Sequence, residues 1–381
     1  MNVSKCVECF NCGLCYNICP HHAITVDKSG TFYKPVVDEE KCTDCGLCFY
    51  KCPVNNEFDA VKPLASFAGW HRDHEVVRSS SSGGIFYGIA RRVLNDGGVV
   101  FGAVYSEDNT EVVFTSSDDT ELRRMQKSKY VESLINDAFS RIHKHLRENR
   151  SVLFCGTPCQ VAGLKSFLGR DYEKLLLCDF ACGGLPSHKM FQEYLTSLKC
   201  KYGSQVGSVD FRPKTHGWRR YAVLVKFMNG KVYNRLGVED PFLRSFLYSK
   251  CIVRESCLDC KFSVSHQSDL TIADFWLNKE LSTLANDNGI SLVLCNTDKG
   301  RKAMVMIQSD YELQELCADA VSYNNHPTAA TMEELEKRNL FLHDYRDKGF
   351  VYACQRNFSL SRKEQVKNCL RRICFRERGW K

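Results

Sequence analysis

The sequence predicts a protein of two parts, an α+β ferredoxin-like module of the bacterial two-cluster type and an α/β domain with a mixed, partly parallel sheet. Nine of the 22 cysteines fall within residues 6–52, and eight of them belong to a motif that occurs twice. From residue 79 onward, apolar runs of strand length alternate with segments of helical periodicity, which favours an α/β domain. The length of 381 residues is enough for two or three domains.

Composition and charge narrow the classes of function. Hydrophobic residues make up 44% and charged residues 25%, as in ordinary globular proteins. No apolar leader follows Met1 and no run of 18 apolar residues occurs, so we expect a cytoplasmic protein whose cysteines bind metal or stay reduced. The net charge of +7 equals the surplus of nine basic over two acidic residues in 355–381. Residues 1–354 therefore carry no net charge, and we expect no nucleic-acid-binding domain among them.

The amino-terminal motif is C-x2-C-x2-C-x3-C-P, over residues 9–20 and again over 42–53. In bacterial ferredoxins three cysteines of such a run hold one 4Fe-4S cluster and the fourth reaches the other cluster, whereas a zinc ribbon needs only one set of four ligands. Short strands are expected at 23–27 and 31–37, and Cys6 is interpreted as a bystander. The expected ligands are Cys9, Cys12, Cys15 and Cys52 for the first cluster, and Cys42, Cys45, Cys48 and Cys19 for the second.

The α/β part is expected to begin after a connector near residues 57–63. Asn229-Gly230 between two apolar runs predicts a hairpin over 221–232. The remaining strands are expected at 99–105, 111–115, 151–154, 174–180, 270–275 and 290–295, and the helices at 85–94, 130–146, 161–168 and 188–198.

Two polar loops of this part are candidate anion sites. Serines and glycines over 79–84 directly precede a helix, an arrangement typical of phosphate binding, although a flexible linker with a serine cap would read the same way. Residues 127–130, read as a loop leading into a helix, either supply a cation to the same anion or form a solvated basic turn.

Two further loops follow neighbouring predicted strands, Gly156-Thr157-Pro158-Cys159-Gln160 and residues 181–184. If both strands are parallel, the loops leave the sheet at one carboxyl edge, where ligands of open α/β folds bind. Cys159 and Cys182 would then be neighbours, and Cys257 and Cys260 supply a third loop with thiols. These four cysteines are consistent with a further 4Fe-4S cluster, with zinc or with no metal.

Taken together, these segments resemble the coenzyme F420 hydrogenase/dehydrogenase beta-subunit family, iron-sulfur flavoproteins that include the plant hydroxymethyl chlorophyll a reductase. The resemblance runs from about residue 66 to residue 280, and several members carry a ferredoxin module ahead of it. The matching segments are residues 81–84, 97–102, 128–131, 152–160, 182–187, 254–260 and 268–276.

The resemblance implies FAD over the sheet edge and a 4Fe-4S cluster held by Cys159, Cys182, Cys257 and Cys260. The family commonly reads Cys-His-Gly where this chain has Gly183, and many members have glycine at Ala273, so a relative's substrate does not transfer directly. The residues implied to contact FAD are Ser82, Gly83, Gly84, Ser128, Lys129, Tyr130, Gly156, Thr157, Pro158, Gln160 and Asp274.

The function we expect is an oxidoreductase that passes electrons between ferredoxin-type clusters and FAD, where a deazaflavin-like or other small organic substrate reacts. Its partner would be a redox protein or another external electron donor. The alternatives are a non-enzymatic electron-relay subunit of a larger redox complex and a scaffold that uses metal only for folding.

Four regions are expected: 1–58, the ferredoxin domain; 64–148 and 149–320, the two beta-subunit-type regions; and 321–381, a helical extension with a basic tail. Apolar residues recur at helical spacing within 366–374 of this tail. The pattern indicates either a solvated terminal helix or one that docks on an acidic carrier or an anionic membrane surface.

Overall fold

The computed structural model describes residues 1–6, 8–56, 62–117, 121–276, 286–316 and 329–358. The expected connector falls largely outside this part of the chain, and so does the basic tail from residue 359 onward. Across the described ranges, no helix has both the length and the apolar character needed to cross a membrane.

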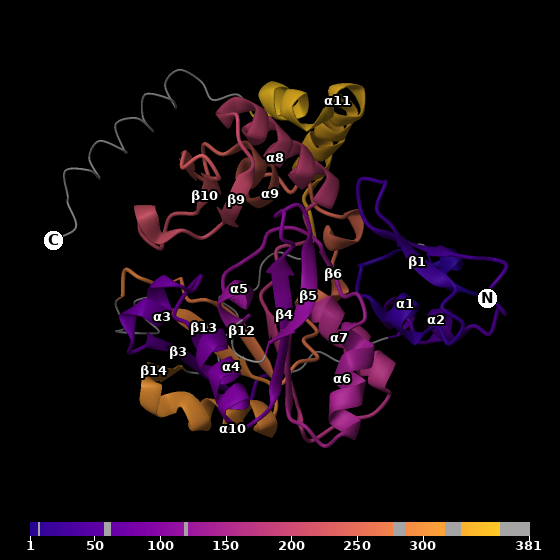
Figure 1. The fold of residues 1–381 in the computed structure, drawn as a ribbon, viewed down its shortest axis with the longest axis vertical. Coiled ribbons are helices and arrows are strands. Elements are labelled where there is room, and N and C mark those ends of the chain that lie inside the picture. Colours follow the sequence, from indigo (N-terminus) through magenta and orange to yellow (C-terminus); the bar gives the residue numbers. More distant parts are fainter. Residues whose placement is uncertain (7, 57–61, 118–120, 277–285, 317–328, 359–381) are drawn as a thin grey trace.

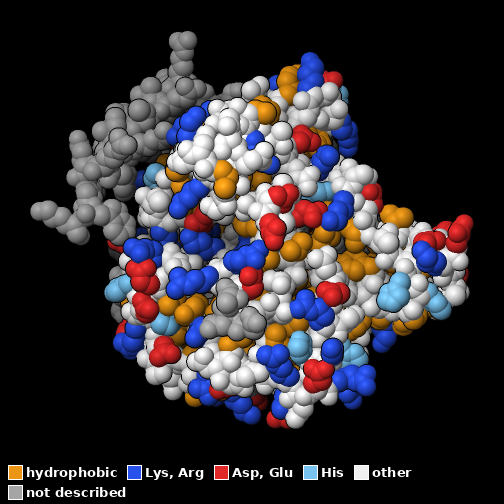
Figure 2. All heavy atoms as spheres, viewed as in Figure 1, with side chains coloured by type: hydrophobic (Ala, Val, Ile, Leu, Met, Phe, Trp, Pro, Cys, Tyr) orange, Lys and Arg blue, Asp and Glu red, His pale blue; other side chains and the backbone are white. Residues whose placement is uncertain are grey.

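The amino-terminal module projects from one side of the molecule, beside helices of the larger part (Figures 1 and 2). Its two strands pair antiparallel, with Ile24 opposite Val37. Each of its helices directly follows the glycine of one copy of the cysteine motif. The elements are α1 (Leu14–Ile18), β1 (Ile24–Asp27), β2 (Lys34–Val37) and α2 (Leu47–Tyr50).

A nine-stranded mixed sheet forms the centre of the larger part, in the order β14-β3-β13-β12-β8-β7-β4-β5-β6. The neighbours β12–β8, β8–β7, β7–β4 and β5–β6 are parallel and the other four pairs are antiparallel, which confirms the expected mixed, partly parallel sheet. The strands are β3 (Ala65–His71), β4 (Val99–Tyr105), β5 (Val112–Ser117), β6 (Ser133–Leu134), β7 (Val152–Cys155), β8 (Leu175–Phe180), β12 (Leu270–Asp274), β13 (Ser291–Cys295) and β14 (Tyr311–Leu316).

Helices pack on both faces of the sheet and form a separate apolar core on each face. On one side, Ile89 and Met304 pack with Val100 and Leu153 of the strands. In the other core, Ile142 and Val161 join Phe101, Phe154 and their neighbours. The helices are α4 (Ile85–Asn95), α5 (Leu122–Met125) and α10 (Asp298–Ile307) for the first core and α6 (Ala138–Arg147) and α7 (Pro158–Leu168) for the second; the short α3 (His74–Arg78) follows β3.

A second layer lies above the carboxyl edge of β7 and β8, at the top of Figure 1. A three-stranded antiparallel sheet, in the order β11-β10-β9, packs there against three helices around an aromatic-rich core. The expected hairpin turn is confirmed: β10 pairs with β11, and Gly230 adopts φ 81°. The elements are α8 (His188–Tyr202), β9 (Val206–Asp210), β10 (Ala222–Phe227), β11 (Val232–Leu236), α9 (Pro241–Leu247) and α11 (Met332–Asn357).

The helix expected over 130–146 is wrong in its first half. Residues 133 and 134 form β6, which pairs parallel with β5, and Asn136 then takes a left-handed φ of 51° before α6 begins. Sheet pairing therefore prevails over local helical periodicity. Residues 127–130 consequently lie between a helix and a strand, and not before a helix as expected.

Candidate functional site

The two copies of the cysteine motif fold alike. Gly13 and Gly46 each adopt the left-handed conformation, with φ 86° and 77°, at the residue before the short helices α1 and α2. A side chain is strained in this conformation, and a Cβ at Gly13 would lie 2.5 Å from Ile135 Cγ1. The repeated glycine is thus required by the loop that presents the cysteines.

The structure brings together the four cysteines expected for the first cluster. Burial, and then the neighbouring thiols Cys52 and Cys9, raise the pKa of Cys12 above its usual value. The pKa of Cys15 is raised in the same way, by burial and then by Cys12, Cys9 and Cys52. The fourth cysteine of the second motif therefore lies among the first three of the first motif, as the crossed ligand pattern requires.

The second expected set lies farther outward. Cys48 has Cys19 and Cys45 as its thiol neighbours, and Cys45 is exposed. Cys42 Sγ accepts a hydrogen bond from Asn2 at 3.6 Å.

Cys6, expected to be a bystander, lies at the edge of the first set. Its side chain hydrogen-bonds to that of Cys52, and burial followed by the nearby thiol of Cys6 raises the pKa of Cys52 to about 11.

The third group of cysteines also meets in space. Cys159 lies in the first turn of α7, and its neighbouring thiols are Cys182, Cys257 and Cys260. Burial and then these thiols raise the pKa of Cys159, and burial raises that of Cys182 to about 12. Within the described residues, no three His, Cys, Asp or Glu side chains converge closely enough to hold a single metal ion.

Phe10, which lies between Cys9 and Cys12 in the sequence, connects the first cysteine set to the third cysteine group. The Cys159 thiol donates to the Phe10 carbonyl at 3.6 Å, and the Phe10 ring packs edge-on against Phe262 with centroids 5.0 Å apart. On α7, a Cβ at Gly163 would lie 3.0–3.3 Å from Cys12 atoms, so the helix can approach the cysteine loop because this residue is glycine.

A cavity of about 320 Å³ opens beside the third cysteine group. Its size falls within the range of small-molecule sites. Cys182 belongs to both the cysteine group and the cavity wall, and the adjacent Gly183 also lines the cavity. Most residues expected to contact FAD line this cavity: Ser82, Gly84, Ser128, Lys129, Tyr130, Gly156, Thr157, Gln160 and Asp274; Gly83 and Pro158 are immediate neighbours of lining residues.

The amino termini of α4 and α7 both border the cavity. Gly84 precedes α4 in the left-handed conformation, and no side chain caps the helix there. Unpaired amide groups and the helix dipole at such an end favour an anion. At α7 the amide of Gln160 is already engaged, because Oε1 accepts from Thr157 N at 3.0 Å and Nε2 donates to Ser133 Oγ at 2.9 Å. Gln160 therefore shapes the wall.

The two candidate anion loops lie side by side. Ser81 Oγ accepts from Ser128 N at 2.8 Å, and the two hydroxyls are 3.0 Å apart. Lys129 directs its ammonium to the carbonyls of Met125, Gln126 and Lys127, at 3.2, 2.9 and 3.2 Å. Lys129 thus holds the loop in shape, and burial lowers its pKa to about 7.

Arg212 is a cavity residue that the sequence did not indicate. It follows β9, pairs with Asp274 at 2.7 Å and lies over the Tyr221 ring at 4.4 Å. Its partner Asp274 was expected at the site, but no motif surrounds Arg212 itself.

Gly183 leaves room in the cavity wall. A Cβ at this position would meet only Phe246 Cζ, at 3.8 Å. The side chain that the resembling family commonly has here would therefore find open space.

Comparisons with known proteins place both parts of the chain. Residues 149–320 match the family model for the carboxy-terminal part of the coenzyme F420 hydrogenase/dehydrogenase beta subunit, and residues 8–56 match that for a 4Fe-4S dicluster domain. A chain of the xenon-derivatised F420-reducing NiFe hydrogenase complex from Methanosarcina barkeri is 16% identical, with a TM-score of 0.49 over 78% of this chain and 97% of that chain. The comparison with curated proteins finds no match. Residues 149–320 thus form a carboxy-terminal region of the coenzyme F420 hydrogenase/dehydrogenase beta-subunit type, and a 4Fe-4S dicluster domain precedes it in the chain.

Proposed function

We propose that this chain is an FAD- and iron-sulfur-dependent oxidoreductase, in which electrons pass between two ferredoxin-type clusters, a third 4Fe-4S cluster and FAD. A small organic substrate, deazaflavin-like or of another class, reacts at the flavin. FAD exchanges electrons singly with clusters and in pairs with organic substrates, so the combination converts one kind of transfer into the other. The observation that carries the proposal is the shared position of Cys182, which borders the cavity and belongs to the third cysteine group.

The residues of the cavity fit FAD in kind. Ser82, Gly84 and the free amino terminus of α4 would receive its pyrophosphate. Tyr130, Tyr221 and Trp276 supply an aromatic wall suited to a flat ring system. Arg212 adds a buried positive charge, with 5% of its surface exposed, that would stabilise negative charge on the bound group.

The order of the cysteine groups supports a linear path. Cys45 of the second set is exposed, whereas Cys12 of the first set contacts α7, which carries Cys159. An external donor or acceptor would therefore exchange electrons at the outer end of the projecting module. The path then runs inward through the first set to the third group, which borders the cavity.

Domain boundaries follow from the same proposal. Residues 1–58 form the ferredoxin domain, 64–148 contribute the serine-glycine loop and the 127–130 segment, and 149–320 contribute the third cysteine group and the rest of the cavity. The extension from 321 onward packs α11 against α8.

The test is the cofactor content of the anaerobically purified full chain. About 12 irons and one FAD per chain would support the proposal, and about 8 irons without flavin would favour the electron-relay subunit. Stopped-flow reduction with reduced F420, reduced ferredoxin and NAD(P)H would then identify the donor. A chain that holds 12 irons and FAD but is reduced by none of these would require another class of partner.

A further inference from the structure

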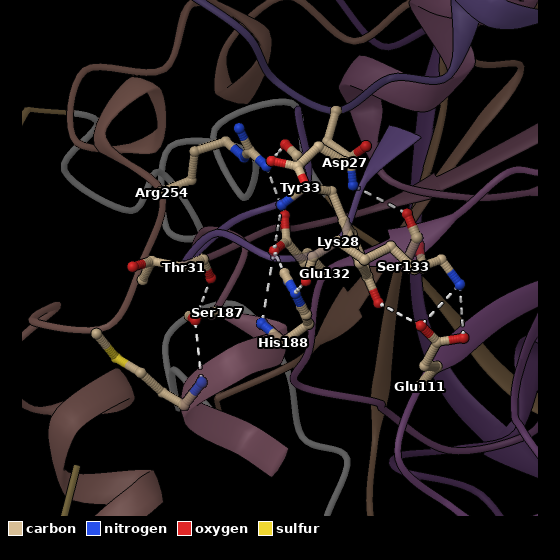
Figure 3. A network of polar contacts seen from close by, with 12 residues as sticks. Asp27, Lys28, Thr31, Tyr33, Glu111, Glu132, Ser133, Ser187, His188 and Arg254 are labelled. Atoms are coloured by element: carbon tan, nitrogen blue, oxygen red, sulfur yellow. Dashed lines mark hydrogen bonds and ion pairs between the residues drawn. The ribbon is translucent and has the colours of Figure 1, made fainter. Parts of the chain in front are cut away.

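A buried polar junction joins the amino-terminal module to the larger part (Figure 3). At its centre, the fully buried Glu132 carboxylate accepts from Arg254 Nη2 at 2.6 Å and from Tyr33 N at 3.1 Å, and it lies 2.7 Å from His188 Nδ1. The Tyr33 ring stacks on His188 with centroids 3.8 Å apart. These residues come from the module, from the segment before α6, from the start of α8 and from the loop that carries Cys257.

Arg254 is the member of this junction that reaches two cysteine groups. Its Nη1 donates to the Cys9 carbonyl at 3.3 Å, and its own carbonyl accepts from Cys257 N at 3.0 Å. Only 5% of its surface is exposed, so its charge is poorly screened by water. An arginine side chain stays protonated in proteins, and Arg254 pairs with the buried Glu132, so it is a fixed positive charge beside both groups.

We propose that the buried charge of Arg254 raises the reduction potentials of two clusters. One is the cluster of the first cysteine set, which contains Cys9, and the other is the cluster of the third cysteine group, which contains Cys257. The second half of this inference rests on the proposed function, because it assumes a cluster at Cys257. Reduction adds one electron to a cluster and breaks no bond, so a nearby fixed positive charge stabilises the reduced form. Glu132 pairs with Arg254 at 2.6 Å, and its opposite charge partly offsets this effect.

The charges of Arg254 and Glu132 predict opposite outcomes, which a purely structural role would not. In an anaerobic potentiometric titration of the full chain, followed by EPR, Arg254→Met should lower the ratio of reduced to oxidised cluster about tenfold at a fixed potential, a shift of about 59 mV for one electron. Glu132→Gln should raise this ratio. Arg254→Lys, which keeps the charge, should restore most of the wild-type value.

The chain offers a matched control. Arg338 is also buried and donates to the carbonyl of Val253, the residue before Arg254, at 3.1 Å. Arg338→Met should leave both potentials close to the wild-type values. An equal downward shift in Arg338→Met, or shifts of the same sign in Arg254→Met and Glu132→Gln, would overturn the proposal.

Folding and cofactor content are checked independently. If the single variants do not fold, the double variant Arg254→Met/Glu132→Gln replaces them, because it removes both partners of the ion pair together. Its reduction potential should still lie below that of the wild type, by less than the shift expected for Arg254→Met, because Arg254 is the partner that contacts Cys9. An unchanged potential in the double variant would overturn the proposal. If the wild type holds only about 8 irons, the proposed function has failed, and the potential of the Cys9 cluster alone decides the role of Arg254.

Discussion

Replacing Cys257 by alanine removes one thiol from the third cysteine group and leaves Cys159, Cys182 and Cys260 in place. These four side chains are mutual neighbours, so loss of one ligand should release the whole cluster they are proposed to hold. Iron content should fall from about 12 to about 8 per chain, while the EPR signals of the two ferredoxin clusters remain. Truncation of this half-buried side chain should itself cost only about 1 kcal/mol, so the fold should persist.

The assay is colorimetric iron and acid-labile sulfide per folded chain, with EPR of the reduced protein. Cys251→Ala is the matched control, because Cys251 is 1% exposed and its thiol donates to the Ser249 carbonyl at 3.6 Å, outside the three cysteine groups. It should retain all of the iron. Full iron content in Cys257→Ala, or an equal loss in Cys251→Ala, would refute the assignment of the third group.

Three further predictions follow from single contacts. Gly163→Ala places a methyl group 3.0–3.3 Å from atoms of Cys12. Overpacking should cost about 1–3 kcal/mol and the better helix propensity of alanine should return about 1 kcal/mol, so the free energy of unfolding should fall by about 0–2 kcal/mol. Denaturant titration measures this change, and a gain in stability would contradict the close approach. Lys129→Ala should weaken FAD retention on gel filtration by loosening the 127–130 loop, and undiminished flavin content would remove Lys129 from the site. Burial alone lowers the pKa of His266, but Asp179 at 2.9 Å raises it overall. The ion pair should therefore stabilise the fold fully below about pH 6.5, the usual pKa of histidine. This stabilisation should vanish as the pH rises through the higher pKa that His266 has in the folded state. The difference in Tm between wild type and His266→Asn should therefore be larger at pH 6 than at pH 9, and a difference independent of pH would contradict the pairing.

Much of the α/β part was predictable because its signals are local. Apolar runs located β4, β7, β8, β12 and β13 to within a residue or two, and the Asn229-Gly230 pair located the turn between β10 and β11. The strands β3 and β14 at one side of the sheet were not predicted. They became strands through pairing with each other and, for β3, with β13, which is far from it in the sequence.

The candidate site divides in the same way. Its loops carry recognisable motifs, so nearly all the residues expected around FAD do line one cavity. Arg212 and Glu132 lie outside the motifs, and Arg254 begins one without revealing its charged partner. Each of these side chains finds its counterpart more than 60 residues away in the sequence. The helix predicted over 130–146 failed for a related reason, since pairing with β5 outweighs its helical periodicity.

The cysteine spacing alone predicted the two ferredoxin ligand sets, because C-x2-C-x2-C constrains three thiols within one short loop and the repeat suggests the fourth. The sequence also predicted the family type of the region 149–320 and the mixed α/β architecture. The meeting of Cys159, Cys182, Cys257 and Cys260 beside Phe10 became visible only in the folded chain, and so did the buried charge of Arg254 between two of the cysteine groups. Those contacts join distant loops, and their geometry depends on how the module packs against α7, which no local spacing encodes.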